Sequence, residues 1–244
     1  METAISVTGL NKSFGSLRAV ENLSFSVSSG EVFGLLGTNG AGKTTTIECV
    51  LGTKRADSGK VSILGMDPQK DRKRLFQAVG VQFQEGAYQD RIAVRELCEV
   101  TQSLYARPAD CRKLLGQLGL SDKEKSAVSD LSGGQRQRLF IVLALIPNPR
   151  VVFLDELTTG LDARARRAIW KYLAEMKRKG LAVLLTSHFM DEVEALCDHL
   201  LILKNGRSVF SGTVQEAVSA SPYDRFEDAY LWFTGEEDTI HEDI

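Results

Sequence analysis

The sequence predicts an α/β fold with a mainly parallel sheet, on the strength of three short apolar runs. Residues 32–36, 151–154 and 181–186 have the length and composition of buried strands. A glycine-rich turn follows the first run, two carboxylates follow the second, and a serine and a histidine follow the third. Open α/β sheets bind ligands at the carboxyl ends of their strands. A chain of 244 residues suits one large domain, or one domain with a small inserted lobe.

Composition and charge narrow the possible classes of protein. The net charge of −2 gives no overall bias toward nucleic acid or an anionic membrane. The four cysteines lack metal-like spacing, which favours reduced thiols in a cytosolic protein. The N-terminal residues do not resemble a signal peptide, and the longest apolar run, 139–147, is shorter than the roughly 18 residues that span a bilayer. A membrane role would therefore need a separate membrane subunit.

The first sixty-five residues predict a small antiparallel sheet beside the main one. Residues 5–10 and 19–27 alternate like strands, and residues 61–65 form a further short strand after a predicted turn at 58–60. Phe14 lies at the first turn. It is a candidate to stack on a nucleotide base, and the alternative is a partly buried turn aromatic.

Residues 37–45 match G-x-x-x-x-G-K-[ST], a phosphate-binding loop between a strand and a helix. Glycines let the backbone wrap a phosphate, and the N–H groups of the loop and helix start then face the anion. Lys43 adds a positive charge, and Thr44 offers a hydroxyl to Mg²⁺. The other loop residues predicted to bind phosphate are Thr38, Asn39, Gly40, Ala41, Gly42 and Thr45.

Polar residues predicted to act on the phosphates lie farther along the chain. Residues 79–84 form a strand that ends in Gln84, at the ligand-binding edge. Residues 151–156 end in Asp155, a candidate Mg²⁺ ligand, and Glu156, a candidate to polarise an attacking water. His188 follows the strand at 181–186 and can donate a hydrogen bond to phosphate. Their alternative roles are a surface glutamine, solvated acids and a structural histidine.

The start of a second predicted helix is also suited to bind phosphate. Ser132 and Gln135 fit a capping box, and Gly133 and Gly134 leave bare N–H groups in the first turn. Asp162 is a plausible N-cap for the helix after it. The pattern between Gln84 and residue 131 is helical, and Asn205-Gly206 predicts a hairpin.

These motifs, in this order, resemble the ATP-binding cassette of ABC transporters over nearly the whole chain. Residues 37–45 look like Walker A, 151–156 like Walker B with its catalytic glutamate, and 131–135 like the LSGGQ signature. The resemblance implies a P-loop NTPase (RecA-like) core that uses ATP and Mg²⁺. It makes Gln84 the Q-loop glutamine and a metal ligand, Asp162 the D-loop aspartate, His188 the switch histidine and Phe14 the aromatic under adenine.

The resemblance also implies an organisation and an assembly. Residues 1–84 and 131–221 would form the catalytic core with its β subdomain, 85–130 an inserted helical lobe, and 222–244 a C-terminal extension. Two cassettes would dimerise head to tail, with Ser132 to Gln135 of one on the ATP of the other. A separate membrane subunit would hold the cassettes at the cytoplasmic face of the membrane.

The sequence departs from the family at Thr38 and Leu157, where proline is usual. Leu157, residues 52–68 and residues 226–235 look most like cassettes of drug, antibiotic or lipid exporters (ABC-2 type). Two alternatives remain open: an importer cassette, and a soluble ABC ATPase acting on nucleic acid or ribosomes. The absence of a long coiled coil or second cassette disfavours the latter, so no nucleic-acid partner is expected.

Overall fold

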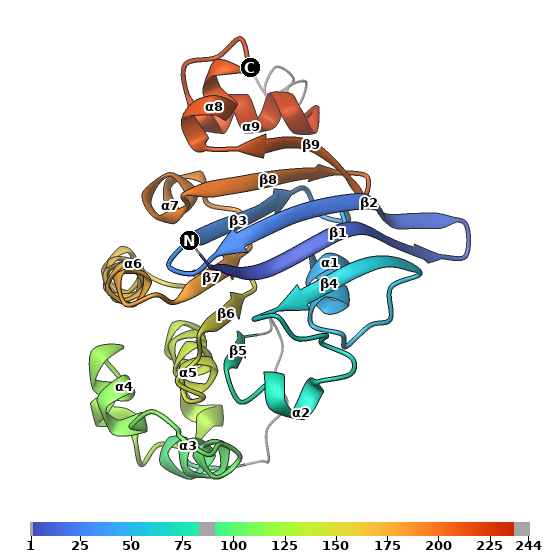
Figure 1. Cartoon of the computed structure of the whole chain (residues 1–244). Coiled ribbons are helices and arrows are strands. Elements are labelled where there is room, and N and C mark those ends of the chain that lie inside the picture. The colour runs from blue at the N-terminus through green and yellow to red at the C-terminus, as the bar shows by residue number, and fades with distance from the viewer. Residues whose placement is uncertain (1, 83–90, 237–244) are drawn as a thin grey trace.

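The computed structural model describes residues 2–82 and 91–236, and within them it contains two sheets. The larger has six strands in the order β5-β6-β7-β3-β8-β9, parallel except for β9 (Figure 1). These strands are β3 (Val32–Gly37), β5 (Val79–Gln82), β6 (Val151–Leu154), β7 (Ala182–Leu185), β8 (His199–Lys204) and β9 (Arg207–Gly212). The predicted α/β class with a mainly parallel sheet is confirmed.

The smaller sheet is antiparallel and is built from β1 (Thr3–Phe14), β2 (Leu17–Ser28) and β4 (Ser58–Ile63), in the order β2-β1-β4. The prediction of an N-terminal antiparallel sheet is confirmed. The predicted turn at residues 58–60 is wrong, because Lys60 pairs with Thr8 and Ser58 with Asn11 across a register shift. The pairing with β1 overrides the turn preference of the serine and glycine.

The helices lie at both ends of the large sheet and along its flank (Figure 1). Those of the described chain are α1 (Lys43–Val50), α2 (Arg72–Leu75), α3 (Val94–Ser103), α4 (Cys111–Gln117), α5 (Gly133–Leu145), α6 (Ala163–Arg178), α7 (Met190–Leu196), α8 (Val214–Ser219) and α9 (Phe226–Thr234). Helices α3, α4 and α5 gather at the β5 end, and α8 and α9 lie beyond β9. The helical pattern predicted after Gln84 thus forms α3 and α4.

Strand β6 shows how the main sheet carries an apolar core on each face. Val152 and Leu154 pack with α3, α4 and α5, whereas Val151 and Phe153 pack on the other side with α1 and the antiparallel sheet. This alternation is the period of two of a β-strand. Leu115 of α4 belongs to the same cluster as Val152, so the helical lobe shares a continuous core with the sheet. The boundaries proposed at 84/85, 130/131 and 221/222 stay predictions.

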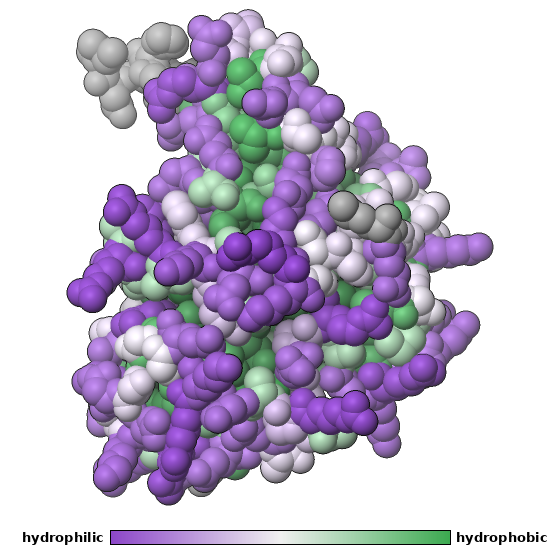
Figure 2. All heavy atoms as spheres, turned by 60° about the vertical axis from the view of Figure 1, so that its left-hand side comes forward, coloured by the Kyte–Doolittle hydropathy of each residue, from purple (hydrophilic) through white to green (hydrophobic). Residues whose placement is uncertain are grey.

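The flank that carries α6 and α7 is predominantly hydrophilic, with hydrophobic residues showing between the polar side chains (Figure 2). The exposed side of α6 includes Arg164, Arg167 and Lys171. Across residues 2–82 and 91–236, every helix is too short or too polar to cross a membrane.

Candidate active site

The predicted site residues follow three neighbouring strands of the main sheet and lie at the same edge of it. Strand β7 lies between β6 and β3, with Leu185 opposite both Leu154 and Gly34. Because the strands are parallel, the phosphate-binding loop after β3, the carboxylates after β6 and the serine and histidine after β7 meet at their carboxyl ends. The sheet order therefore brings the loop at residues 37–45 to segments that lie more than a hundred residues later in the chain.

The loop between β3 and α1 depends on its glycines. Gly42 has φ +107°, in the left-handed region, and a Cβ there would collide with the carbonyl oxygen of Ala19. Gly40 also has a positive φ, of +80°. Only glycine combines this conformation with this close approach, so the loop can present its N–H groups at the start of α1.

Lys43 begins α1 with its ammonium group inside the loop. Its Nζ donates to the carbonyl oxygens of Gly37 at 2.7 Å and Thr38 at 3.0 Å, and only 9% of the residue is exposed. Burial lowers the pKa of Lys43, and the nearby Asp155 and Glu156 oppose that shift. A cation held in a sparsely solvated loop, facing two carboxylates, is well placed to bind phosphate oxygens.

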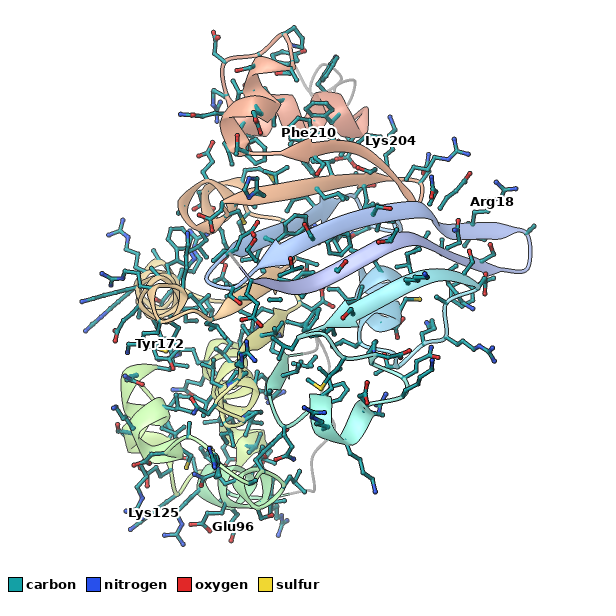
Figure 3. The ribbon with its side chains drawn as sticks, viewed as in Figure 1. Arg18, Glu96, Lys125, Tyr172, Lys204 and Phe210 are labelled. Atoms are coloured by element: carbon teal, nitrogen blue, oxygen red, sulfur yellow. The ribbon has the colours of Figure 1, made fainter. Side chains whose placement is uncertain are left out.

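A pocket of about 640 Å³ opens over this loop, within the size range of small-molecule sites. It brings together half of the predicted residues: Phe14, Asn39, Gly40, Gly42, Lys43, Thr44, Thr45, Asp155 and Glu156. Leu17, Arg18, Ala19 and Asn205 also line it, and the sequence offered no signal for them. Figure 3 shows Arg18 in the part of the antiparallel sheet that projects beyond the main sheet.

Phe14 is 44% exposed at the end of β1 and lines the pocket mouth. The Nζ atoms of Lys54 and Lys12 lie 4.9 and 5.3 Å from its ring centroid. The place of Phe14 in the pocket lining favours the base-stacking interpretation over a partly buried turn aromatic. The two ammonium groups over the ring can attract phosphate to this part of the pocket.

We expect Phe14→Ala to weaken ATP binding by about 1–3 kcal/mol, as for other stacks of a base on an aromatic side chain. Equilibrium titration of the purified chain with ATP measures this loss. Phe14→Tyr keeps the ring and is the matched control, with parental affinity expected. If the alanine variant binds ATP as tightly as the parent, Phe14 does not stack on the base.

Asp155 follows β6 and is held by the end of β7. The hydroxyl of Thr186 donates to Asp155 Oδ1 at 2.6 Å and accepts from the backbone N–H of Glu156 at 2.9 Å. Burial raises the pKa of Asp155, and the hydrogen bond from Thr186 partly opposes this. The sequence predicts that Thr186 lies in a strand and indicates no role for it. Its position beside Asp155 follows from the pairing of Leu154 with Leu185.

Glu156 adopts φ +51°, a left-handed conformation that is uncommon outside glycine and recurs at functional sites. The chain therefore turns sharply after Asp155. The Glu156 carboxylate lies 3.4 Å from His188 Nε2. On its other side, the Gln137 amide donates to the Glu156 carbonyl oxygen at 3.1 Å. Glu156 is thus held between the β7 loop and α5, a connection that the sequence did not reveal.

The second predicted helix start forms as expected but lies apart from the pocket. Ser132 Oγ accepts from Gln135 N, and Gln135 Oε1 accepts from Ser132 N, which completes the capping box of α5. Asp162 accepts from Ala165 N at 2.8 Å and caps α6. Of the residues that the structure describes, none from 132 to 135, nor Asp162, lines the pocket. Their predicted contact with a nucleotide stays a prediction.

The remaining predicted residues are found nearby, with one exception. Thr38 and Asn39 line a smaller hollow of about 290 Å³ together with His188 and residues of α9. Ala41 is buried within the loop, where its carbonyl oxygen accepts from Gly206 N at 3.0 Å. Gln84 lies outside the described residues, so its predicted role stays a prediction.

A glycine-rich loop with a buried lysine, beside two carboxylates at a strand end, defines a phosphate-loop nucleoside triphosphatase. The chain belongs to the ABC transporter family, whose model matches residues 20–159. It is an ATP-binding protein and an ATPase.

Relatives and solved structures agree with this membership. The chain is 38% identical over 221 residues to the Nod factor export ATP-binding protein I of Rhizobium etli, covering 88% of this chain and 70% of that protein. It matches the structure of an ATP-binding subunit of an ABC transporter with a TM-score of 0.87 and 26% identity, over 95% of this chain and all of the other. It shares its fold with MJ0796, a bacterial ABC transporter cassette solved as a dimer (TM-score 0.78, 21% identity, 86% and 98% coverage).

Proposed function

We propose that this chain is the ATP-hydrolysing subunit of an exporter whose membrane-spanning part is a separate chain. The pocket that joins Phe14, the phosphate-binding loop and the Asp155-Glu156 pair carries the proposal for ATP. The direction of transport follows the relatives, which are named for export. The cassette would then work at the cytoplasmic face of the membrane through its partner.

The predicted residues of the site have distinct proposed roles. Phe14 stacks on the adenine, the loop N–H groups and Lys43 bind the β- and γ-phosphates, and Glu156 orients and deprotonates the attacking water. His188, in contact with Glu156, donates a hydrogen bond to the γ-phosphate. Lys43 would exchange its bonds to the Gly37 and Thr38 carbonyls for phosphate oxygens when ATP binds.

Asp155 and Thr44 fit the role of Mg²⁺ ligands. Mg²⁺ is usually held by one or two carboxylates together with substrate phosphates. Asp155 supplies a carboxylate fixed by Thr186, and Thr44 supplies a hydroxyl on the same pocket. When bound, Mg²⁺ neutralises charge on the β- and γ-phosphates. Gln84 is the third proposed ligand.

The contact between Thr186 and Asp155 predicts a pH effect. Thr186→Val removes a hydrogen bond that lowers the pKa of Asp155, so that pKa rises further above its ordinary value. A protonated Asp155 cannot hold Mg²⁺, so the acid limb of the kcat/KM profile should move to higher pH. Thr186→Ser keeps the hydroxyl and should retain the parental profile. If the acid limb of the valine variant does not move, protonation of Asp155 is not the cause of that limb.

We propose that two copies of the cassette form the complete site. The backbone N–H groups in the first turn of α5, after Ser132, can bind an anion, but this turn does not line the pocket of the same chain. A head-to-tail dimer would bring it over the ATP of the other copy, and the MJ0796 cassette is dimeric. Within one chain, Gln137 connects this helix to the Glu156 turn. The helix that begins at the LSGGQ-like segment is therefore hydrogen-bonded to the proposed catalytic glutamate of the same chain.

The exporter proposal is tested by purifying the tagged full chain from detergent-solubilised membranes of its own cell. A multi-span membrane protein that copurifies in stoichiometric amounts is expected. Vesicles containing that complex should then accumulate or release substrate in an ATP-dependent, outward direction. Recovery with ribosomes or nucleic acid would overturn the proposal in favour of a soluble ABC ATPase, and inward transport would favour an importer.

A further inference from the structure

The turn between β8 and β9, at Asn205 and Gly206, lies beside β2, and none of the roles above uses it (Figure 1). It contacts two parts of the ATP pocket. One part is the phosphate-binding loop. The other, the base side, consists of Phe14, Leu17, Arg18 and Ala19. A nucleotide that stacks on Phe14 and also binds the loop must span both parts, so their separation decides whether the two contacts form together.

Gly206 is hydrogen-bonded through its backbone to the loop and to β2. Its N–H donates to the carbonyl oxygen of Ala41 at 3.0 Å, and its carbonyl oxygen accepts from the N–H of Glu21 at 2.8 Å. Beside it, Arg207 Nη2 lies 2.7 Å from Glu21 Oε1, and the same carboxylate oxygen lies 3.1 Å from Arg18 Nη1. The turn thus connects the loop to β2 by backbone hydrogen bonds and to the base side by two ion pairs that share one carboxylate.

The close approach of this turn to the base side requires glycine. Gly206 is buried and has φ +79°, and a Cβ there would lie 2.8 Å from the carbonyl oxygen of Arg18 and 2.9 Å from that of Ala19. A side chain at this position would therefore have to push backbone atoms away. The three atoms nearest to that Cβ all belong to Arg18 and Ala19, so the displacement would fall on the base side.

We propose that Gly206 is a positioning residue, which sets the separation between the base side and the phosphate-binding loop and thereby the preference of the site for ATP over bare triphosphate. This role rests on the stacking of Phe14 on adenine proposed above. Gly206 is not among the described residues that line the pocket, so it acts through the backbone of β2. Because inorganic triphosphate needs only the loop and ATP needs both parts, the ratio of the two affinities reports their separation.

The test measures the affinity of the full chain for MgATP and for inorganic triphosphate. Gly206→Ala should weaken MgATP binding by about fivefold or more, as partial or full loss of a base stack does, and leave triphosphate binding within about twofold. KM for MgATP should rise with little change in kcat, the pattern of lost uniform binding. In a Phe14→Ala background the substitution should have no further effect on MgATP affinity, because no stack remains to misalign.

Gly65→Ala is the matched control. Leu64 and Gly65 form a turn of the same kind, with φ angles of +52° and +75°. A Cβ at Gly65, however, would meet no heavy atom of the described chain within 4 Å beyond its chain neighbours. The variant adds the same methyl group and similar backbone strain, so it should lower the melting temperature and leave both affinities unchanged.

Equal losses for MgATP and triphosphate in Gly206→Ala, or parental MgATP affinity, would overturn the proposal, as would a further loss in the Phe14→Ala background. If Gly206→Ala does not fold, Arg207→Ala decides the question. It removes the ion pair with Glu21 without adding an atom, and a selective loss of MgATP affinity of about twofold is expected. No selective loss there would equally overturn the proposal. Parental ATP affinity in Phe14→Ala alone would instead refute the stacking role of Phe14.

Discussion

Glu156→Gln is expected to bind ATP but to hydrolyse it roughly 10²-fold or more slowly than the parent, because glutamine cannot accept the proton of the attacking water. The substitution leaves the local structure supported, since the Glu156 backbone is held by Thr186 on one side and Gln137 on the other. Only the carboxylate that faces His188 changes its charge. Phosphate release and ATP titration on the same preparation separate hydrolysis from binding.

Glu175→Gln is the control for this substitution. Glu175 lies on the exposed side of α6, where it pairs with Lys179, and its replacement should leave hydrolysis unchanged. With MgATP, the Glu156→Gln protein should also elute as a dimer from gel filtration, alone or with its membrane partner. Parental hydrolysis in Glu156→Gln would assign the catalytic base to another group, with His188 the next candidate.

Lys43→Ala is expected to weaken nucleotide binding and abolish turnover. The ammonium group is the buried cation at the base of the pocket, and its loss leaves the outer phosphates facing Asp155 and Glu156. The loop also loses the hydrogen bonds to the Gly37 and Thr38 carbonyls.

A second variant controls for the lost length and volume of the side chain. Lys43→Met keeps the unbranched stem but lacks the ammonium group, with its charge and its hydrogen bonds, so it should fail like Lys43→Ala if that group binds the phosphates. Lys171→Ala, on the exposed side of α6, controls for loss of one positive charge. ATP affinity and steady-state hydrolysis are the readouts. A normal rate in Lys43→Met would refute the assignment of this loop to the triphosphate.

Motifs that lie within a few residues were predictable from the sequence. The phosphate-binding loop, the Ser132 capping box, the Asp162 cap and the hairpin at Asn205-Gly206 all form as expected. Each is a local structure, whose hydrogen bonds and backbone angles depend on neighbouring residues. At Asn205 and Gly206 the φ angles are +50° and +79°, as the turn requires.

The contacts that could not be predicted from the sequence are those between distant segments. Thr186 reaches Asp155 because β6 and β7 pair in one register, and Gln137 reaches Glu156 because α5 packs beneath the same turn. Nothing in the local pattern marks a strand-end threonine or a helical glutamine for such a role. The left-handed conformation of Glu156 is likewise a product of its surroundings, because glutamate has no intrinsic preference for it.

We propose that each ATP is hydrolysed between the phosphate-binding loop of one copy and the Ser132 helix start of another. A substitution at Gly133 can block the part of this site that the Ser132 helix start supplies. A Cβ at Gly133 would meet no heavy atom of the described chain within 4 Å, whereas one at Gly134 would lie 3.0 Å from the Gly160 carbonyl oxygen. Gly133→Leu should therefore fold and bind ATP normally, and obstruct only the approach of a second cassette.

The decisive measurement mixes the Gly133→Leu and Lys43→Ala proteins and assays ATP hydrolysis, with the membrane partner present if closure requires it. Each protein alone should be inactive. The mixture should regain activity, because a mixed dimer pairs the intact loop of one copy with the intact helix start of the other. Parental activity of Gly133→Leu alone, or a mixture no more active than its components, would contradict a site shared between two cassettes.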